Sequence, residues 1–124
     1  MKVCLSSTGD NLDAQIDMRF GRCRYFLFVD TDSMKFEAVD NANIASAGGA
    51  GIRSAQLIAD KEAQVLLSGN VGPNAFDVLN AAGIKIYSGI SGSIKEALEK
   101  LKSGELNETS GPDVGSKFGF GGNR

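Results

Sequence analysis

Histidine is absent from this chain of 124 residues. Imidazole is the most common general base near neutral pH and one of the most common metal ligands in proteins. Its absence excludes Ser–His and Cys–His catalytic systems, and a zinc site would depend on cysteines and carboxylates alone. The composition therefore disfavours hydrolytic enzymes, and we expect a protein that is not an enzyme.

Cysteine is scarce as well, since Cys4 and Cys23 are the only two. They are too few for a disulfide scaffold, and a four-cysteine cluster site cannot form within one chain. Cys4 lies in an apolar run, which favours core packing. Cys23 lies between Arg22 and Arg24, and we expect these charges to lower the pKa of its thiol. Cys23 is therefore the candidate ligand for a soft metal, and the alternative is an exposed cysteine with no functional role.

The chain also lacks long apolar runs and a large excess of charge of one sign. No segment approaches the roughly 20 apolar residues that cross a bilayer. The N-terminus becomes polar at Ser6, which is too early for a signal peptide. The net charge of −2 differs from the basic excess typical of nucleic-acid-binding proteins. We expect a cytoplasmic protein with neither a membrane nor a nucleic-acid partner.

The apolar pattern that is present predicts elements in the order β-β-β-α-β-α-β-α. Apolar and β-branched runs predict strands at residues 2–7, 25–30, 34–40, 63–68 and 84–87. Helical spacing of apolar residues predicts helices that begin near Ile52, at Pro73 and after Ser93, which forms a capping box with Glu96.

This order predicts one α/β domain over residues 1–102, with a mixed five-stranded sheet in the strand order 3-2-1-4-5. That is the three-layer, ribonuclease H-like arrangement. Residues 103–124 are rich in glycine and poor in aliphatic side chains. Such a segment buries too little apolar area to offset its ordering entropy, so we expect a disordered tail.

Glycine-rich turns precede all three predicted helices, at residues 47–51, 70–73 and 89–92. In an open α/β sheet, turns of this kind gather at the carboxyl ends of the strands, where ligands bind. Helix N-termini offer N–H donors and a partial positive charge, which suit an anion. The alternative is that these glycines only form tight turns and allow close packing.

The loop that precedes the second strand carries arginines that are expected to reach the same edge of the sheet. The alternative is a solvated surface on which arginines and aspartates form weak ion pairs. Together, the loop and the turns give these candidate binding residues: Arg19, Phe20, Gly21, Arg22, Cys23, Gly49, Gly51, Asn70, Gly72 and Asn74. A ribonuclease H-like nuclease is disfavoured, because two-metal cleavage requires several converging carboxylates and the central strands supply none.

Several segments of the chain resemble the dinitrogenase iron–molybdenum cofactor biosynthesis family. They recur in the family's order and cover the chain from about residue 3 to residue 101. The matching segments are Arg19-Phe20-Gly21-Arg22, Tyr25-Phe26-Leu27-Phe28-Val29-Asp30, Gly49-Ala50-Gly51-Ile52, Ala55-Gln56-Leu57, Ser68-Gly69-Asn70-Val71-Gly72-Pro73-Asn74-Ala75 and Ala82-Gly83-Ile84.

The resemblance implies a ribonuclease H-like domain that binds or carries an iron–sulfur or iron–molybdenum cluster, with a protein partner in cofactor assembly. Two departures bear on this role. The chain has no histidine near a cluster or in its tail, and Cys23 stands where the family commonly has alanine. Two other functions stay open, namely binding of a small phosphate- or carboxylate-bearing anion, and an adaptor role that acts through a protein partner.

Overall fold

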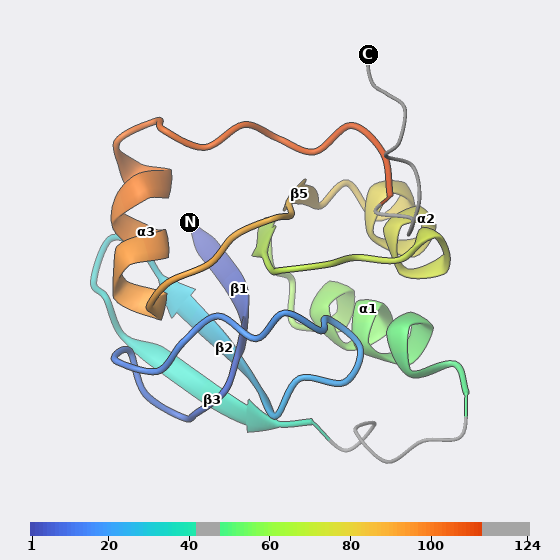
Figure 1. The fold of residues 1–124 in the computed structure, drawn as a ribbon, viewed down its shortest axis with the longest axis horizontal. Helices are drawn as coiled ribbons and strands as arrows, with labels where there is room; N and C mark the ends of the chain where they lie inside the picture. Colours follow the sequence, from blue (N-terminus) through green and yellow to red (C-terminus); the bar gives the residue numbers. More distant parts are fainter. Residues whose placement is uncertain (42–47, 113–124) are drawn as a thin grey trace.

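The computed structural model describes residues 1–41 and 48–112. The strands are β1 (Lys2–Ser7), β2 (Tyr25–Asp30), β3 (Phe36–Asp40), β4 (Val65–Leu67) and β5 (Lys85–Tyr87). The helices are α1 (Ala50–Asp60), α2 (Pro73–Ala81) and α3 (Ile94–Lys102), and the order of elements is the one that the sequence predicts (Figure 1).

The five strands form one mixed sheet in the order β3-β2-β1-β4-β5, which confirms the predicted strand order. β1 pairs with β4 and β4 with β5 in parallel, whereas β1–β2 and β2–β3 are antiparallel. The parallel strands therefore end at one edge of the sheet, where β1 finishes at Ser7 and β4 at Leu67.

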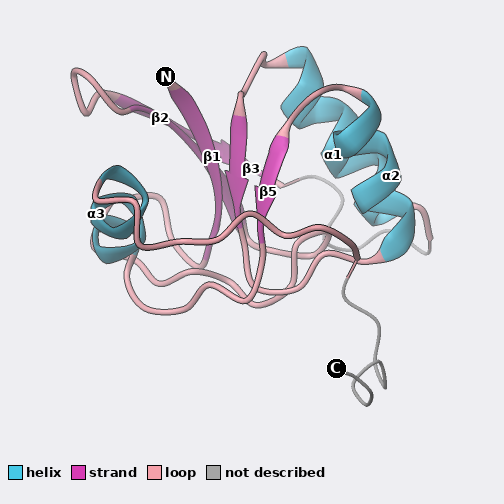
Figure 2. Ribbon diagram, turned by 90° about the horizontal axis from the view of Figure 1, so that it is seen from above, coloured by secondary structure: helices cyan, strands magenta, loops and turns pink. Residues whose placement is uncertain are grey.

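Helices cover both faces of this sheet, α1 and α2 on one face and α3 on the other (Figure 2). β1 shows how the sequence fills both cores, because successive side chains of a strand point to opposite faces. Cys4 packs in the α1/α2 core, while Val3 and Leu5 pack in the α3 core with Ile94. All of these side chains are fully buried, as expected for a central strand covered on both sides.

The folded part extends past residue 102, the boundary expected from composition. Leu106 packs against the α3 core, and the backbone N–H of Thr109 donates to the Ile86 carbonyl at 2.7 Å. The Ser88 N–H in turn donates to Thr109 Oγ1 at 2.8 Å. This segment thereby supplies hydrogen-bond partners to the edge strand β5. The glycine-rich composition of the segment gives no indication of this pairing. The remaining tail, 113–124, and Ala47 of the first glycine-rich turn lie outside the described residues.

None of the described helices combines the length and the apolar composition needed to cross a membrane.

Candidate functional site

A cavity of about 350 Å³ opens where the N-termini of α1 and α2 meet the loop between β1 and β2. A volume of this size is within the usual range for a small-ligand site. Its walls contain every sequence-predicted site residue except Cys23. These residues are Arg19, Phe20, Gly21, Arg22, Gly49, Gly51, Asn70, Gly72 and Asn74.

Both helices present an N-terminus to the cavity without a side-chain cap from the described residues. α1 follows Gly49, whose φ of 71° is left-handed and suits glycine, and α2 follows Gly72. Pro73 occupies the first position of α2, where its missing N–H costs nothing. Neither helix has an acidic residue in its first turn. The first-turn N–H groups and the positive ends of two helix dipoles therefore face the same cavity.

The third wall is a loop, residues 8–24, that backbone hydrogen bonds attach to the turn between β4 and α2. The Asn70 N–H donates to the Met18 carbonyl at 2.8 Å, and the Phe20 N–H donates to the Asn70 carbonyl at 3.3 Å. Gly69 permits this approach, because a Cβ on Gly69 would lie 2.4 Å from Met18 Cα. The loop is therefore part of the folded scaffold rather than a separate surface excursion.

Phe20 and Gly21 fix the loop against the rest of the domain. The Phe20 ring is buried, with its centroid 5.5 Å from that of Phe26. Gly21 lies directly against the start of α1, since a Cβ there would be 2.8 Å from the Gly51 nitrogen. A larger residue at position 21 would push the loop away from the helix N-terminus.

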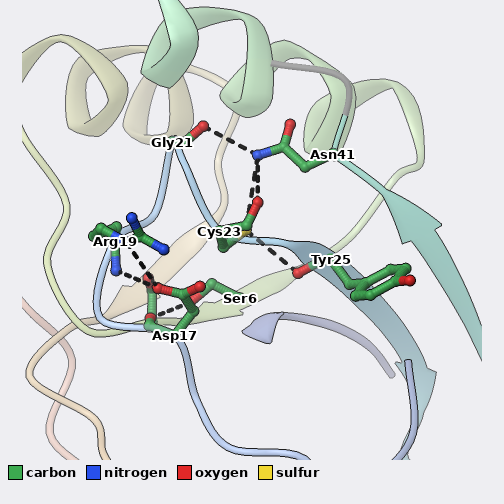
Figure 3. Close-up of polar contacts among 8 residues, drawn as sticks. Ser6, Asp17, Arg19, Gly21, Cys23, Tyr25 and Asn41 are labelled. Atoms are coloured by element: carbon green, nitrogen blue, oxygen red, sulfur yellow. Dashed lines mark hydrogen bonds and ion pairs between the residues drawn. The ribbon is translucent and has the colours of Figure 1, made fainter. Parts of the chain in front are cut away.

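The cavity is electropositive by its side chains as well as by its helices. Arg19 and Arg22 line it, and no acidic residue does so among the described residues. Arg19 is oriented by the buried Asp17, whose Oδ1 accepts from the Arg19 backbone N–H at 3.0 Å and lies 3.4 Å from Nε (Figure 3). The Arg19 side chain is 66% exposed, so its charge remains available to a ligand.

Cys23 differs from its expected role. Its side chain is fully buried, and its Sγ donates to the Tyr25 carbonyl at 3.3 Å (Figure 3). Burial, followed by the charge of Asp17, raises the pKa of the Cys23 thiol to about 12, so the expected lowering of its pKa is wrong. The neighbouring Arg24 lies over the Tyr25 ring, at 5.4 Å from its centroid, and is exposed. Burial therefore has a larger effect on the pKa of the Cys23 thiol than the arginines next to it in sequence.

Cys4 behaves as predicted, since it is a fully buried core residue. Burial also raises the pKa of its thiol well above the ordinary value. Within residues 1–41 and 48–112, no three His, Cys, Asp or Glu side chains come together as a set that would hold a metal ion. The described site therefore offers hydrogen bonds and positive charge rather than metal ligands.

The third glycine-rich turn does not join the cavity, in contrast to the other two. It leads into α3, which lies on the opposite face of the sheet, and Ile90 of this turn is buried in the α3 core. The predicted capping box is present there: Ser93 Oγ accepts from the Glu96 N–H at 3.0 Å, and Glu96 Oε1 accepts from the Ser93 N–H at 3.0 Å.

Three contributors are not among the site residues that the sequence predicts. Ile52 and Ala75 complete the walls of the cavity from the first turns of α1 and α2. Their positions in the first turn of each predicted helix are the sequence feature that could have identified them. Asn41 lies beneath the loop and donates through Nδ2 to the carbonyls of Gly21 and Cys23 at 3.1 Å and 2.8 Å. No local pattern marks Asn41, because its partners are 18 and 20 residues away in sequence.

Solved structures with the same fold include two that are clearly similar in sequence. The apo form of the orange protein from Desulfovibrio gigas is 39% identical, with a TM-score of 0.88 over 91% of this chain and 96% of that one. A Thermotoga protein provisionally described as NifB is 38% identical, with a TM-score of 0.75 over 86% of this chain and 91% of that one.

Curated sequences and family models agree with this likeness. An uncharacterised protein of Methanocaldococcus jannaschii is 29% identical over 111 residues, which are 87% of this chain and 91% of that protein. The family model described as dinitrogenase iron-molybdenum cofactor matches residues 1–104. Because that match spans the whole α/β domain, the chain belongs to the dinitrogenase iron–molybdenum cofactor family.

Proposed function

We propose that the cavity holds an anionic metal–sulfur cluster, of the iron–sulfur or iron–molybdenum type, as cargo, and that the protein carries it without catalysing a reaction. The observation behind this proposal is the convergence of two uncapped helix N-termini with Arg19 and Arg22 on one cavity that no described acidic side chain lines. Such a surface attracts an anion through charge and directed N–H groups.

The donor set favours holding the cluster by hydrogen bonds rather than by protein–metal bonds. Thiolate and imidazole are the protein ligands that such metals prefer. The chain has no histidine, and both cysteines are buried away from the cavity lining with raised thiol pKa values. A cluster that brings its own sulfide ligands needs neither, because its outer sulfur atoms accept hydrogen bonds from the helix ends and the guanidinium groups.

The composition of the lining supports a carrier rather than an enzyme. The described lining residues are arginine, asparagine, glycine, proline, alanine, isoleucine and phenylalanine. This set contains no hydroxyl, thiol, carboxylate or amine side chain to serve as a nucleophile or as a general acid or base. Family membership and the likeness to the orange protein also favour a role connected with a cluster.

Anaerobic incubation with iron and sulfide, or with isolated iron–molybdenum cofactor, followed by desalting and metal analysis, tests this function. We expect near-stoichiometric retained metal with charge-transfer absorption. Cys23→Ser is the informative variant, because cargo held without protein ligands is retained in it to the same extent. Retention that disappears in Cys23→Ser would contradict binding without protein ligands, and no retained metal in the folded wild-type protein would contradict the carrier function.

Binding of a small phosphate- or carboxylate-bearing anion is the second candidate. The absence of a metal-ligating cluster among the described residues favours it, since the same helix N-termini and arginines would bind an organic anion directly. A protein that retains no metal but shows amide shifts at Gly51 and Asn74 on titration with phosphate would support this function over the first.

A further inference from the structure

Asn41 holds the cavity loop from beneath, although it is outside the cavity lining itself. It follows the last residue of β3, and its side chain is 1% exposed. Its backbone N–H donates to the Arg24 carbonyl at 3.1 Å, which extends the pairing of β3 with β2. Its side-chain Nδ2 donates to the carbonyls of Gly21 at 3.1 Å and Cys23 at 2.8 Å (Figure 3).

These two hydrogen bonds orient the carbonyl groups of the loop. A side-chain amide nitrogen carries two N–H donors, and the carbonyls of Gly21 and Cys23 are its nearer acceptors, with Cys23 Sγ farther away at 3.9 Å. The Gly21 carbonyl thus faces the buried Asn41 rather than the cavity that Gly21 lines. The partial negative charge of a carbonyl oxygen inside an electropositive cavity would weaken its attraction for an anion. Asn41 therefore affects the electrostatics of a site that it does not touch.

The hydrogen bonds of Asn41, together with the one at 3.5 Å from Ser54 Oγ of α1 to the Gly21 carbonyl, hold the loop against α1. Gly21 packs so closely against the first turn of α1 that a Cβ there would lie 2.9 Å from Gly51 Cα. Arg19 and Arg22 flank Gly21 on the same loop and line the cavity with it. A loop released from Asn41 would shift both arginines relative to the helix N–H groups, and the binding geometry of a site depends on such support.

We propose that Asn41 is a positioning residue of the anion site, which keeps the Gly21 carbonyl turned inward and the arginine loop seated on the N-terminus of α1. This inference rests on the anion-binding role proposed above and adds to it the residue that pre-organises the third wall of the cavity.

Sulfate binding by Asn41→Asp tests the proposal, because this change keeps the size of the side chain and removes both donors at neutral pH. We expect sulfate affinity, measured by isothermal titration at pH 7, to fall by about tenfold or more, since the Gly21 and Cys23 carbonyls lose the Asn41 donor and face a carboxylate, and Gly21 keeps only the longer hydrogen bond from Ser54 Oγ at 3.5 Å. As the pH is lowered towards 4, the carboxyl group that Asn41→Asp introduces takes up a proton, at a higher pH than an exposed aspartate because the position is buried, and donates one hydrogen bond, so we expect partial recovery of affinity. Sulfate stays a dianion over this range, and the wild-type protein shows no such recovery.

Thr31→Val is the matched control, because it also removes a hydrogen bond from a buried side chain to a backbone carbonyl, that of Met1 at 3.2 Å, far from the cavity. Its sulfate affinity should stay within about twofold of the wild-type value. A general loss of stability would affect both variants, whereas recovery in acid is specific to the position of the donor.

The sulfate affinity of the wild-type protein tests the proposed function. The ratio of the Asn41→Asp affinity to the wild-type affinity tests the role of Asn41. Absence of both sulfate and cluster binding in the wild-type protein would contradict the proposed function. Wild-type binding with an Asn41→Asp affinity equal to it, or a loss that acid does not relieve, would overturn the role of Asn41 alone. If Asn41→Asp fails to fold, Asn41→Ser, which retains one donor, carries the test: an intermediate affinity supports the proposal, and an unchanged affinity overturns it.

Discussion

The N-terminus of α3 and those of α1 and α2 all follow glycine-containing turns, but they are completed in different ways. At α3, Ser93 and Glu96 satisfy each other's backbone N–H groups, and a carboxylate lies in the first turn. At α1 and α2 the cap positions are Gly49 and Gly72, which provide no side chain, and the first turn contains no acid. The Ile94 and Lys95 N–H groups of α3 also have partners, since they donate to the Ala14 and Leu12 carbonyls at 2.8 Å and 3.0 Å. The starts of α1 and α2, by contrast, have no side-chain cap from the described residues.

The location of each helix explains the difference. α3 lies alone on one face of the sheet, and its N-terminal N–H groups are satisfied by the Ser93–Glu96 capping box and by carbonyls of the loop 8–24. α1 and α2 lie side by side on the other face and share one cavity with the arginine loop (Figure 2). A side-chain cap thus accompanies the helix start that has only a structural role, and the absence of such a cap at two neighbouring helices marks a candidate binding site.

Transferring the α3 arrangement to α1 should have the largest effect. Ile52 occupies the third helical position of α1, as Glu96 does in α3, and it lines the cavity. Ile52→Glu places a carboxylate beside the bound anion, and we expect sulfate affinity to fall by about 100-fold or more, while the helix itself is not destabilised by an acid in its first turn. Isothermal titration measures this change. Ile52→Gln, which is neutral and equal in size, is the control, and an equal loss in both variants would contradict the electrostatic explanation.

Removal of the cavity arginines should have the next largest effect. We expect Arg19→Ala and Arg22→Ala each to lower sulfate affinity by about tenfold, with a weaker dependence on salt concentration, because a positive charge next to the anion is lost. Titrations at two ionic strengths measure both quantities. Arg24→Ala is the matched control, since Arg24 lies on the Tyr25 ring outside the cavity lining. An equal loss in Arg24→Ala would indicate a general charge effect instead.

Disruption of the α3 cap should change stability and leave binding intact. Ser93→Ala removes the acceptor for the Glu96 N–H, and we expect the free energy of unfolding to fall by about 1 kcal/mol. Urea unfolding measures this loss, and sulfate titration of the same variant should give the wild-type affinity. Weakened sulfate binding in Ser93→Ala would mean that the two faces of the sheet are coupled.

The smallest effect concerns pH. The hydrogen bond from the Ser93 backbone N–H lowers the pKa of Glu96 from its ordinary value of 4.5. A carboxylate with a lowered pKa in the folded state stabilises the protein above its unfolded pKa, and this contribution is lost as the pH falls through the folded pKa. Glu96→Gln should therefore be slightly less stable than the wild-type protein at pH 7, and the difference should shrink in acid. A difference that is constant with pH would contradict this linkage.

Local patterns were sufficient for most of the fold. The apolar run of β1, Pro73 at the start of α2 and the Ser93 capping box each depend on residues close in sequence, and the sequence predicts each of them. The two arginines and the first two glycine-rich turns were also predicted as candidate site residues, and they line one cavity. Cys23 was misjudged because its neighbours in sequence are charged, whereas its neighbours in space are the buried core.

By itself, the sequence determined the order of the elements, the mixed sheet and the exclusion of histidine chemistry, because periodicity and composition are local or global properties of the chain. Only the tertiary structure decided which helix N-termini share a cavity, that the Cys23 thiol is buried, and that Asn41 supports the loop of Gly21. These features depend on contacts between residues far apart in sequence, and burial and direction in space, which govern charge and hydrogen bonding, are set only when the chain packs.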